Sequence, residues 1–342
     1  MRLQLVSVFL FVAAVSAQTQ PPAPAAAPSS PQPNIQVQVN EVIVPVTVTD
    51  EKGRFVSDLD QKDFRVMDEG KEQNIRFFTR ERNQPVVVGF LLDLSNASRL
   101  HWKNYQEAAI ELVLNLLPGD KRYSGYLITY GNEAEVAVNT TTDSEPIVEK
   151  LRKVKPGGGA ALYDAIYAAC TSRKLVVGEP VEPRRVLVVI GDGHDNASKH
   201  TLSEALEVAQ RNLVTIYGVS TVAFGFNAEE EKNLVKLAEE TGGRVEYPLQ
   251  GVYSDVSGFM STPSDEGNYA LKVGTGGYAS ALAKGMFNSI TNVTGEITTQ
   301  YIIRYIPDVQ PESKNANKVF RNIVVKVNLA NVKVRARKGY YP

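Results

Sequence analysis

The pattern of hydrophobic and polar positions changes twice along the chain. Residues 35–82 alternate with a period of two, as in IQVQVNEVIVPVTVTD, which indicates half-buried strands. The same alternation returns in residues 296–342, for example in YIIRYIP and VKVRARKGYYP. Between these segments, continuous apolar runs alternate with stretches of helical periodicity. That rhythm predicts strands buried on both faces and separated by helices, so it favours a mostly parallel sheet with helices on both sides.

The change of pattern also predicts the domain organisation. We expect a doubly wound α/β domain over residues 85–295, with a Gly- and Ser-rich surface insertion at 251–278. The N-terminal β segment (35–82) has too few strands to close a sandwich by itself. The simplest topology pairs it with the C-terminal β segment (296–342) in one β-sandwich, into which the α/β domain is inserted. Two separate small β domains are the alternative, but each would bury little surface.

The N-terminus has the composition of an export signal. Residues 1–17, MRLQLVSVFLFVAAVSA, combine Arg2 with an apolar stretch and small residues at the end, which predicts a signal peptide cleaved after Ala17. A retained anchor is the alternative, although the apolar stretch is shorter than the roughly 20 residues of a spanning helix. Residues 18–34 form a Pro- and Ala-rich linker. We expect a secreted or periplasmic, cell-envelope protein with no transmembrane helix after signal cleavage.

Charge and motif content exclude several classes of function. The 37 Lys and Arg balance 38 Asp and Glu without a basic run, so we expect no nucleic-acid partner. Cys170 is the only cysteine, which excludes an intrachain disulfide and a cysteine-based zinc cluster. No HExxH, GxSxG or P-loop pattern occurs, so we predict a protein that is not an enzyme. A hydrolytic group built from Ser95, His194 and Asp195 is the less favoured alternative, because nothing marks Ser95 as a nucleophile.

Polar side chains follow two of the predicted buried strands. Asp93 and Ser95 come directly after VVVGFLL, and Asp192 follows RRVLVVIG. Ligands of doubly wound sheets bind beyond the carboxyl ends of the strands, where these side chains should meet. Carboxylate and hydroxyl oxygens are the donors that Mg²⁺ prefers. The strand ends are therefore the candidate site.

Three segments resemble the loops of the von Willebrand factor A domain. They are DLSNAS after the first strand, GGGAALYDAI before a helix, and VVIGDGHDNAS. The flanks VPVTVTDEKGRFVSDLDQKDFRVMDEGKEQNIRFF and VKVRARKGYY are similar to the von Willebrand factor A-related proteins of Acidobacteria, so the resemblance covers roughly residues 38–342. It implies a doubly wound domain with a metal-ion-dependent adhesion site and a protein-binding function of the adhesion type.

The resemblance also implies a degenerate form of that metal site. The family motif is Asp-x-Ser-x-Ser on the first loop, a Thr on the second and an Asp on the third. Asp93, Ser95 and Asp192 match the two aspartates and the first serine. Ala97 and Ala160 stand at the other two positions and supply no hydroxyl. The predicted metal ligands are therefore Asp93, Ser95 and Asp192, and the cofactor is at most a weakly bound, water-rich Mg²⁺ or Mn²⁺.

With a degenerate metal site, the loop surface becomes the expected contact with an unidentified protein partner. The predicted partner-binding residues are Asn96, Ser98, Arg99, His194 and Asp195. We expect Ser98 not to replace the missing serine, because a shift of one residue turns a side chain away. The alternative function is a structural envelope component that self-associates through its alternating C-terminal strands.

Overall fold

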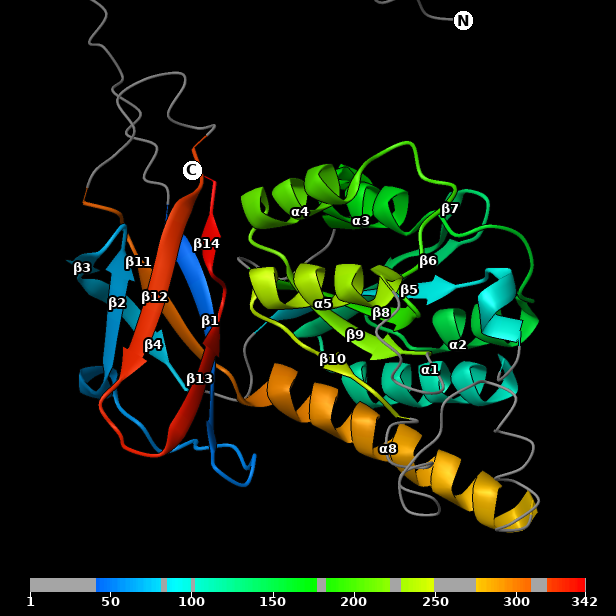
Figure 1. The fold of residues 1–342 in the computed structure, drawn as a ribbon, viewed down its shortest axis with the longest axis horizontal. Coiled ribbons are helices and arrows are strands. Elements are labelled where there is room, and N and C mark those ends of the chain that lie inside the picture. The colour runs from blue at the N-terminus through cyan, green and yellow to red at the C-terminus, as the bar shows by residue number, and fades with distance from the viewer. Residues whose placement is uncertain are drawn as a thin grey trace, which may run out of the picture. The chain divides into compact units, whose positions relative to one another are not determined.

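Three β-sheets organise the chain, which the computed structural model describes over residues 41–80, 85–99, 102–176, 183–221, 229–248, 275–308 and 319–341. The predicted signal peptide and linker, and most of the predicted insertion, lie outside these residues. The central sheet has six strands, and the other two have four each (Figure 1). None of the described helices is both long and apolar enough to cross a membrane.

The central sheet is the doubly wound sheet that the sequence predicts. Its strand order is β10-β9-β8-β5-β6-β7, and every neighbouring pair is parallel except β6 and β7. All residues of the middle strand β5 are buried, as expected for a strand covered on both faces. The strands are β5 (Val86–Asp93), β6 (Tyr123–Tyr130), β7 (Ala134–Thr141), β8 (Arg184–Gly191), β9 (Thr215–Ser220) and β10 (Val245–Glu246).

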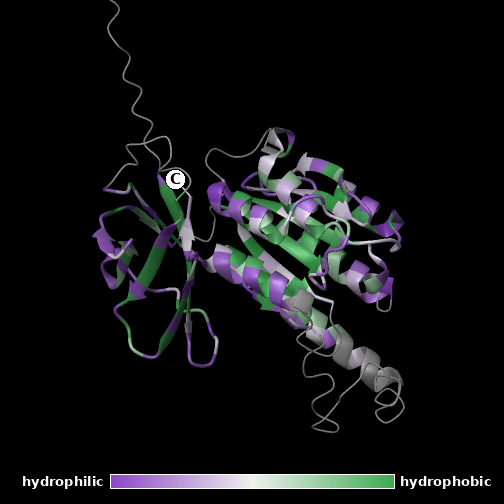
Figure 2. Cartoon of the chain, turned by 45° about the horizontal axis from the view of Figure 1, so that its top comes forward, coloured by the Kyte–Doolittle hydropathy of each residue, from purple (hydrophilic) through white to green (hydrophobic). Residues whose placement is uncertain are grey.

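Helices cover both faces of this sheet, and alternate residues of β5 contact the two layers. Val88 and Phe90 belong to the core shared with α1 (Trp102–Leu116), α2 (Glu145–Lys153) and α8 (Thr275–Thr299). Val87 and Leu91 belong to the opposite core, formed with α3 (Leu162–Thr171), α4 (Leu202–Arg211) and α5 (Glu229–Thr241). Figure 2 shows the hydrophobic strands between helices with hydrophilic outer surfaces. Each fully buried large apolar side chain contributes roughly 1.5–3 kcal/mol, so the two cores anchor the sheet.

The two four-stranded sheets form the β-sandwich predicted from the chain ends. Their orders are β13-β1-β11-β4 and β14-β12-β2-β3, so each sheet contains two strands from each end of the chain. Val44 and Val46 of β1 share one core with Phe64 and Tyr305. The strands are β1 (Val42–Asp50), β2 (Phe64–Asp68), β3 (Lys71–Gln73), β4 (Ile75–Thr79), β11 (Tyr301–Tyr305), β12 (Arg321–Val327), β13 (Val332–Ala336) and β14 (Gly339–Tyr340).

Two elements differ from the sequence-based expectation. Within the alternating segment 35–82, the strand that follows Gly70 is split at Asn74, where β3 ends in one sheet and β4 begins in the other. Strands that change sheets in this way make the corners of a sandwich. Helix α8 also continues to Thr299, past the segment boundary expected at 295 and 296. Its buried Ile290, Val293 and Ile297 keep helical spacing through this Thr-rich end.

A buried polar network fixes the end of α8. The Glu296 side chain is fully buried, and its carboxylate accepts a hydrogen bond from Thr47 Oγ1 at 2.9 Å. The same carboxylate forms ion pairs with Arg335 at 2.5 Å and with Arg244 at 3.0 Å. Because Thr47 lies on β1 and Arg335 on β13, this one carboxylate connects the last helix to the sandwich strands.

We expect Glu296→Gln to destabilise the protein by about 3 kcal/mol, because it leaves two partly buried guanidinium groups without their carboxylate. Urea unfolding followed by circular dichroism measures the change. Glu239→Gln is the matched control, since Glu239 is exposed and its ion pair with Lys338 spans 3.9 Å. The control should change stability by no more than about 0.5 kcal/mol. Equal effects of the two variants would contradict a stabilising role for the network.

Candidate functional site

Three loops meet at the carboxyl ends of the central strands. Loop 1 (93–99) follows β5, the Gly-rich loop (156–161) precedes α3, and loop 3 (192–200) follows β8. Together they are called the loop face below. The chain brings them together at the edge where doubly wound sheets bind ligands.

Backbone hydrogen bonds hold loop 1 against the Gly-rich loop. Gly157 N donates to Leu94 O at 2.5 Å, and Asn96 N donates to Gly158 O at 3.1 Å. Gly158 has a φ of 101°, a conformation that a residue with a side chain rarely adopts. The glycines therefore have a structural role, because they allow the backbones of the two loops to form hydrogen bonds with each other.

Asn196 holds loop 3 against the same Gly-rich loop. Its Oδ1 accepts a hydrogen bond from Ala160 N at 2.8 Å, and its backbone N donates to Ala160 O at 2.9 Å. The Ala160 side chain is fully buried. The position where the family has a threonine is thus closed by backbone pairing and a methyl group, and it offers no hydroxyl.

Asp93 is a buried carboxylate with one unused oxygen. Asp93 is 1% exposed, and its Oδ1 accepts a hydrogen bond from Ser95 N at 2.7 Å. Oδ2 has no hydrogen-bond partner among the described residues. Burial raises the pKa of Asp93 to about 6, and the nearby Asp192 carboxylate adds to the rise, whereas the backbone N–H of Ser95 and the hydroxyls of Ser95 and Ser98 lower it. The site therefore already favours neutralisation of this charge, by a proton or by a cation.

Ser95 and Ser98 both place buried hydroxyls in this region. They are 3% and 2% exposed, and both hydroxyls lie close enough to the Asp93 carboxylate to lower its pKa. Neither Oγ makes a hydrogen bond of regular geometry to a described residue. Residues Asn96–Arg99 form a 3₁₀ turn, in which side chains three positions apart lie on the same side. Ser98 consequently turns inward like Ser95, whereas Ala97 is exposed. This corrects the expectation that Ser98 points away from the site.

Tyr130 is a member of the site that the sequence reasoning missed. It ends β6 in register with Asp93, and its hydroxyl is buried without a hydrogen-bond partner among the described residues. A Cβ at Gly191 would clash with this hydroxyl and would lie 3.3 Å from Asp93 Oδ2. Burial raises the pKa of Tyr130 well above its usual value, and Asp93 and Asp192 raise it further, so the phenol stays protonated. The only sequence signal was its position at a strand end, which becomes informative once the strand order is known.

The carboxylates of loop 3 have different tasks. Asp192 is half-buried, and its Oδ1 accepts a hydrogen bond from His194 N at 2.8 Å. Asp195 Oδ2 accepts hydrogen bonds from Tyr163 N at 2.9 Å and from Ser198 Oγ at 2.6 Å. Asp195 therefore caps the start of α3, in the manner of other helix N-termini.

The predicted partner-binding residues separate by exposure. Asn96 and Arg99 are exposed, and His194 and Asp195 are half-buried. Ser98 is buried, so its side chain is not on the surface where a partner contact was expected. Among the five, Asn96 and Arg99 are thus the side chains that a partner would reach first.

The donor set of the site fits a hard divalent cation. No group of three or more His, Cys, Asp or Glu suited to a metal occurs in the described part of the chain, so hydroxyl oxygens must contribute to any metal site. Unpartnered oxygens do converge near Asp93, and Asp192 adds a second carboxylate close by. An all-oxygen set suits Mg²⁺ or Mn²⁺. The unpartnered atoms are Asp93 Oδ2, Ser95 Oγ, Ser98 Oγ and Tyr130 Oη.

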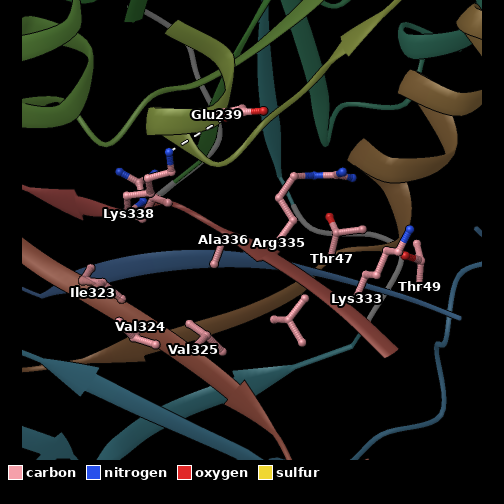
Figure 3. A pocket seen from close by; sticks show the side chains of 12 residues that line it. Thr47, Thr49, Glu239, Ile323, Val324, Val325, Lys333, Arg335, Ala336 and Lys338 are labelled. Atoms are coloured by element: carbon pink, nitrogen blue, oxygen red, sulfur yellow. Dashed lines mark ion pairs between the residues drawn. The ribbon is translucent and has the colours of Figure 1, made fainter. Parts of the chain in front are cut away.

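A separate cleft of about 460 Å³ lies between β12, β13 and the end of α5 and is not lined by the three loops (Figure 3). Its cationic side chains include Arg335, which forms an ion pair with Glu296, and Lys338, whose Nζ lies 3.1 Å from Oε1 of Glu240. Figure 3 shows Lys338 extending toward Glu239. These ion pairs neutralise much of the charge, and the candidate site remains the loop face.

The parallel sheet, its two helix layers and the polar loops at its carboxyl edge define a doubly wound α/β domain of the adhesion-site type. Residues 88–255 match the family described as von Willebrand factor type A domain, so the chain contains a domain of this family. This confirms the resemblance of the three loops to the von Willebrand factor A domain. Domains of this family mediate protein–protein interactions and can hold a metal ion at their adhesion site.

Solved structures similar to the chain have low sequence identity. A von Willebrand factor type A protein from Catenulispora acidiphila is 15% identical, with a TM-score of 0.40, over 63% of this chain and 51% of that one. The mussel byssus proximal thread matrix protein 1 with a zinc-occupied adhesion motif is 14% identical, with a TM-score of 0.39, over 49% and 42%. An aerotolerance-related membrane protein from Bacteroides fragilis is 17% identical, with a TM-score of 0.37, over 60% and 98%. No curated protein matches the chain.

The raised pKa of Asp93 predicts a specific pH dependence of stability in metal-free buffer. Between pH 3.8 and about 6 the folded protein keeps a proton that the unfolded chain releases, so the free energy of unfolding falls as the pH rises. Asp93→Asn removes this loss and should be more stable than wild type by up to about 3 kcal/mol at pH 7. At pH 4 the two proteins should differ little. Urea unfolding in EDTA at both pH values tests this, and a constant difference between them would contradict it.

Proposed function

We propose that the protein is an exported, non-catalytic binding protein of the adhesion type, whose loop face contacts a protein partner. A weakly held Mg²⁺ or Mn²⁺ at Asp93, Ser95 and Asp192 supports this contact. The observation that carries the proposal is the cluster of buried oxygens around Asp93, where the Ser95 and Ser98 hydroxyls lie beside the carboxylate and no hydrogen bond of regular geometry satisfies them within the described part of the chain. An unsatisfied buried polar group costs about 1–3 kcal/mol, so the site is suited to bind a group that satisfies several of them together.

The chemistry of the site supports a binding role for the cation. When bound, a divalent cation offers coordination positions to oxygen ligands, including a carboxylate of a partner protein. Asp93 would hold it through Oδ2, while Ser95 N keeps Oδ1 in place. Asp192 is the second carboxylate and is itself oriented by His194 N. The protein thus supplies both the negative charge and the fixed geometry.

A hydrolytic function has less support. A serine nucleophile needs a base within hydrogen-bond reach, and Ser95 Oγ has no hydrogen-bond partner among the described residues. Asp195 is used as a helix cap, since it accepts hydrogen bonds from Tyr163 N and Ser198 Oγ. The group imagined from Ser95, His194 and Asp195 is therefore not assembled.

Self-association through sheet edges also has less support than partner binding. β13 is an edge strand, and it carries Lys333 and Arg335. Lysine on an edge strand is a common device against pairing with another sheet. The partner contacts that we propose instead involve the exposed Asn96 and Arg99, together with His194.

The cation is tested by calorimetric titration of Mg²⁺ and Mn²⁺ into the mature protein. A second measurement compares the binding of the protein to a candidate partner with and without EDTA. Asp93→Ala should abolish the heat of binding, because it removes the buried charged ligand. Asp120→Ala is the control: it removes an exposed carboxylate that pairs with Arg122 on the surface. Identical heats for wild type and Asp93→Ala, or no heat from wild type, would contradict a cation at this site.

Export is tested with a reporter that is active only outside the cytoplasm. Residues 1–34 fused to alkaline phosphatase should give activity in a bacterial host, because their apolar stretch directs secretion. Leu10→Arg interrupts that stretch and should remove the activity without changing the expression level. Activity retained in the Leu10→Arg fusion would contradict a signal peptide.

A further inference from the structure

We propose that Ser98 and Tyr130 supply the hydroxyl oxygens that Ala97 and Ala160 fail to supply, so that the cation site has a shifted set of ligands. This inference rests on the proposed function, namely that the loop face holds a divalent cation. It concerns which residues complete the site, and it adds a ligand from β6, a strand that contributes nothing to the family motif.

The backbone geometry of loop 1 accounts for the shift from Ala97 to Ser98. In an extended or loosely turned segment, Ser95 and residue 97 would share a side. In the 3₁₀ turn of Asn96–Arg99, the residue that shares a side with Ser95 is three positions on. Ser98 N donates to Ser95 O at 3.2 Å, which closes that turn. The chain thus exposes the alanine and buries the serine.

The sheet accounts for the place of Tyr130. Tyr130 and Asp93 are partners in the parallel pair of β6 and β5, so their side chains leave the same face of the sheet. Both pack against Gly191, where any Cβ would collide with the phenol hydroxyl. Glycine at this position on β8 makes room for the hydroxyl next to the Asp93 carboxylate. Ala160 on the facing loop cannot contribute, because its side chain is a methyl group.

The distribution of unpartnered oxygens singles out this location. Among the described residues, seven buried side-chain oxygens make no hydrogen bond of regular geometry, and four of them belong to Asp93, Ser95, Ser98 and Tyr130. The two serine hydroxyls lie close enough to Asp93 to lower its pKa, so three of these four oxygens are neighbours. The remaining three of the seven are dispersed: two lie at the starts of β6 and β9, and one lies in α8. These four oxygens, the Asp192 carboxylate and bound water would fill the roughly six positions of Mg²⁺.

The experiment measures Mg²⁺ and Mn²⁺ affinity by calorimetry in single-residue variants. Ser98→Ala and Tyr130→Phe each remove one hydroxyl and should weaken affinity by about tenfold or more, in line with losses at supported metal sites. Ser124→Ala and Tyr126→Phe are the matched controls. Ser124 is a buried serine with an unpartnered hydroxyl at the opposite end of β6, and Tyr126 is a buried tyrosine on the same strand. Both controls should retain wild-type affinity.

A further variant distinguishes the shifted register from the family register. Ala97→Ser restores the motif residue at an exposed position, so it should not raise affinity, either alone or combined with Ser98→Ala. Circular dichroism and urea unfolding in EDTA verify that each variant folds. Unchanged affinity in folded Ser98→Ala and Tyr130→Phe, with binding still lost in Asp93→Ala, would overturn the shifted ligands and leave the cation site standing. Absence of binding in wild type would overturn both.

Discussion

The burial of β5 on both faces is the constraint on which the rest of the structure depends. A strand covered by two helix layers delivers its last side chain, Asp93, into a region of low polarity at the edge of the sheet. Burial opposes the charge of this carboxylate and raises its pKa, so the neighbourhood must compensate. The hydrogen bond from Ser95 N compensates in part. The Ser95 and Ser98 hydroxyls compensate further, yet the pKa of Asp93 stays at about 6. This remaining cost of the charge is the physical basis for the cation that we propose.

The same loops show how backbone structure and donor chemistry are connected. The glycines of the Gly-rich loop allow its backbone to form hydrogen bonds with loop 1, and Asn196 joins loop 3 to Ala160 by hydrogen bonds. With the loops fixed in this way, a short 3₁₀ turn decides which serine faces inward. The buried Glu296 network connects the final helix to β1 and β13, so the domain that carries the site is also tied to the sandwich.

Much of the fold could be predicted from sequence because its signals are periodic. Continuous apolar runs identified the central strands, and alternation at both chain ends identified the sandwich. The split at Asn74 could not be predicted, since a bend between two sheets leaves the period of alternation almost unchanged. The end of α8 was missed because Thr-rich segments favour strands, whereas its buried Ile297 continues the helical face. Asp93, Ser95 and Asp192 could be placed at one edge of the sheet because parallel strands end together there, and their role as metal ligands stays a prediction. Ser98 and Tyr130 were not, because one depends on the type of turn and the other on strand order.

This last difference bears on how a degenerate motif should be interpreted. A sequence motif specifies residue types at fixed spacings along the chain, whereas a cation requires oxygen atoms at particular positions in space. Ala97 and Ala160 remove two hydroxyls from the expected spacings, yet Ser98 and Tyr130 bring two buried hydroxyls to the same edge of the sheet. Such a replacement requires only a one-residue change of turn and a glycine, Gly191, that leaves room for a phenol. The proposal of a shifted site therefore rests on where the buried oxygens lie around Asp93 and not on the spacing of the motif, because a buried polar group that makes no good hydrogen bond costs the fold free energy.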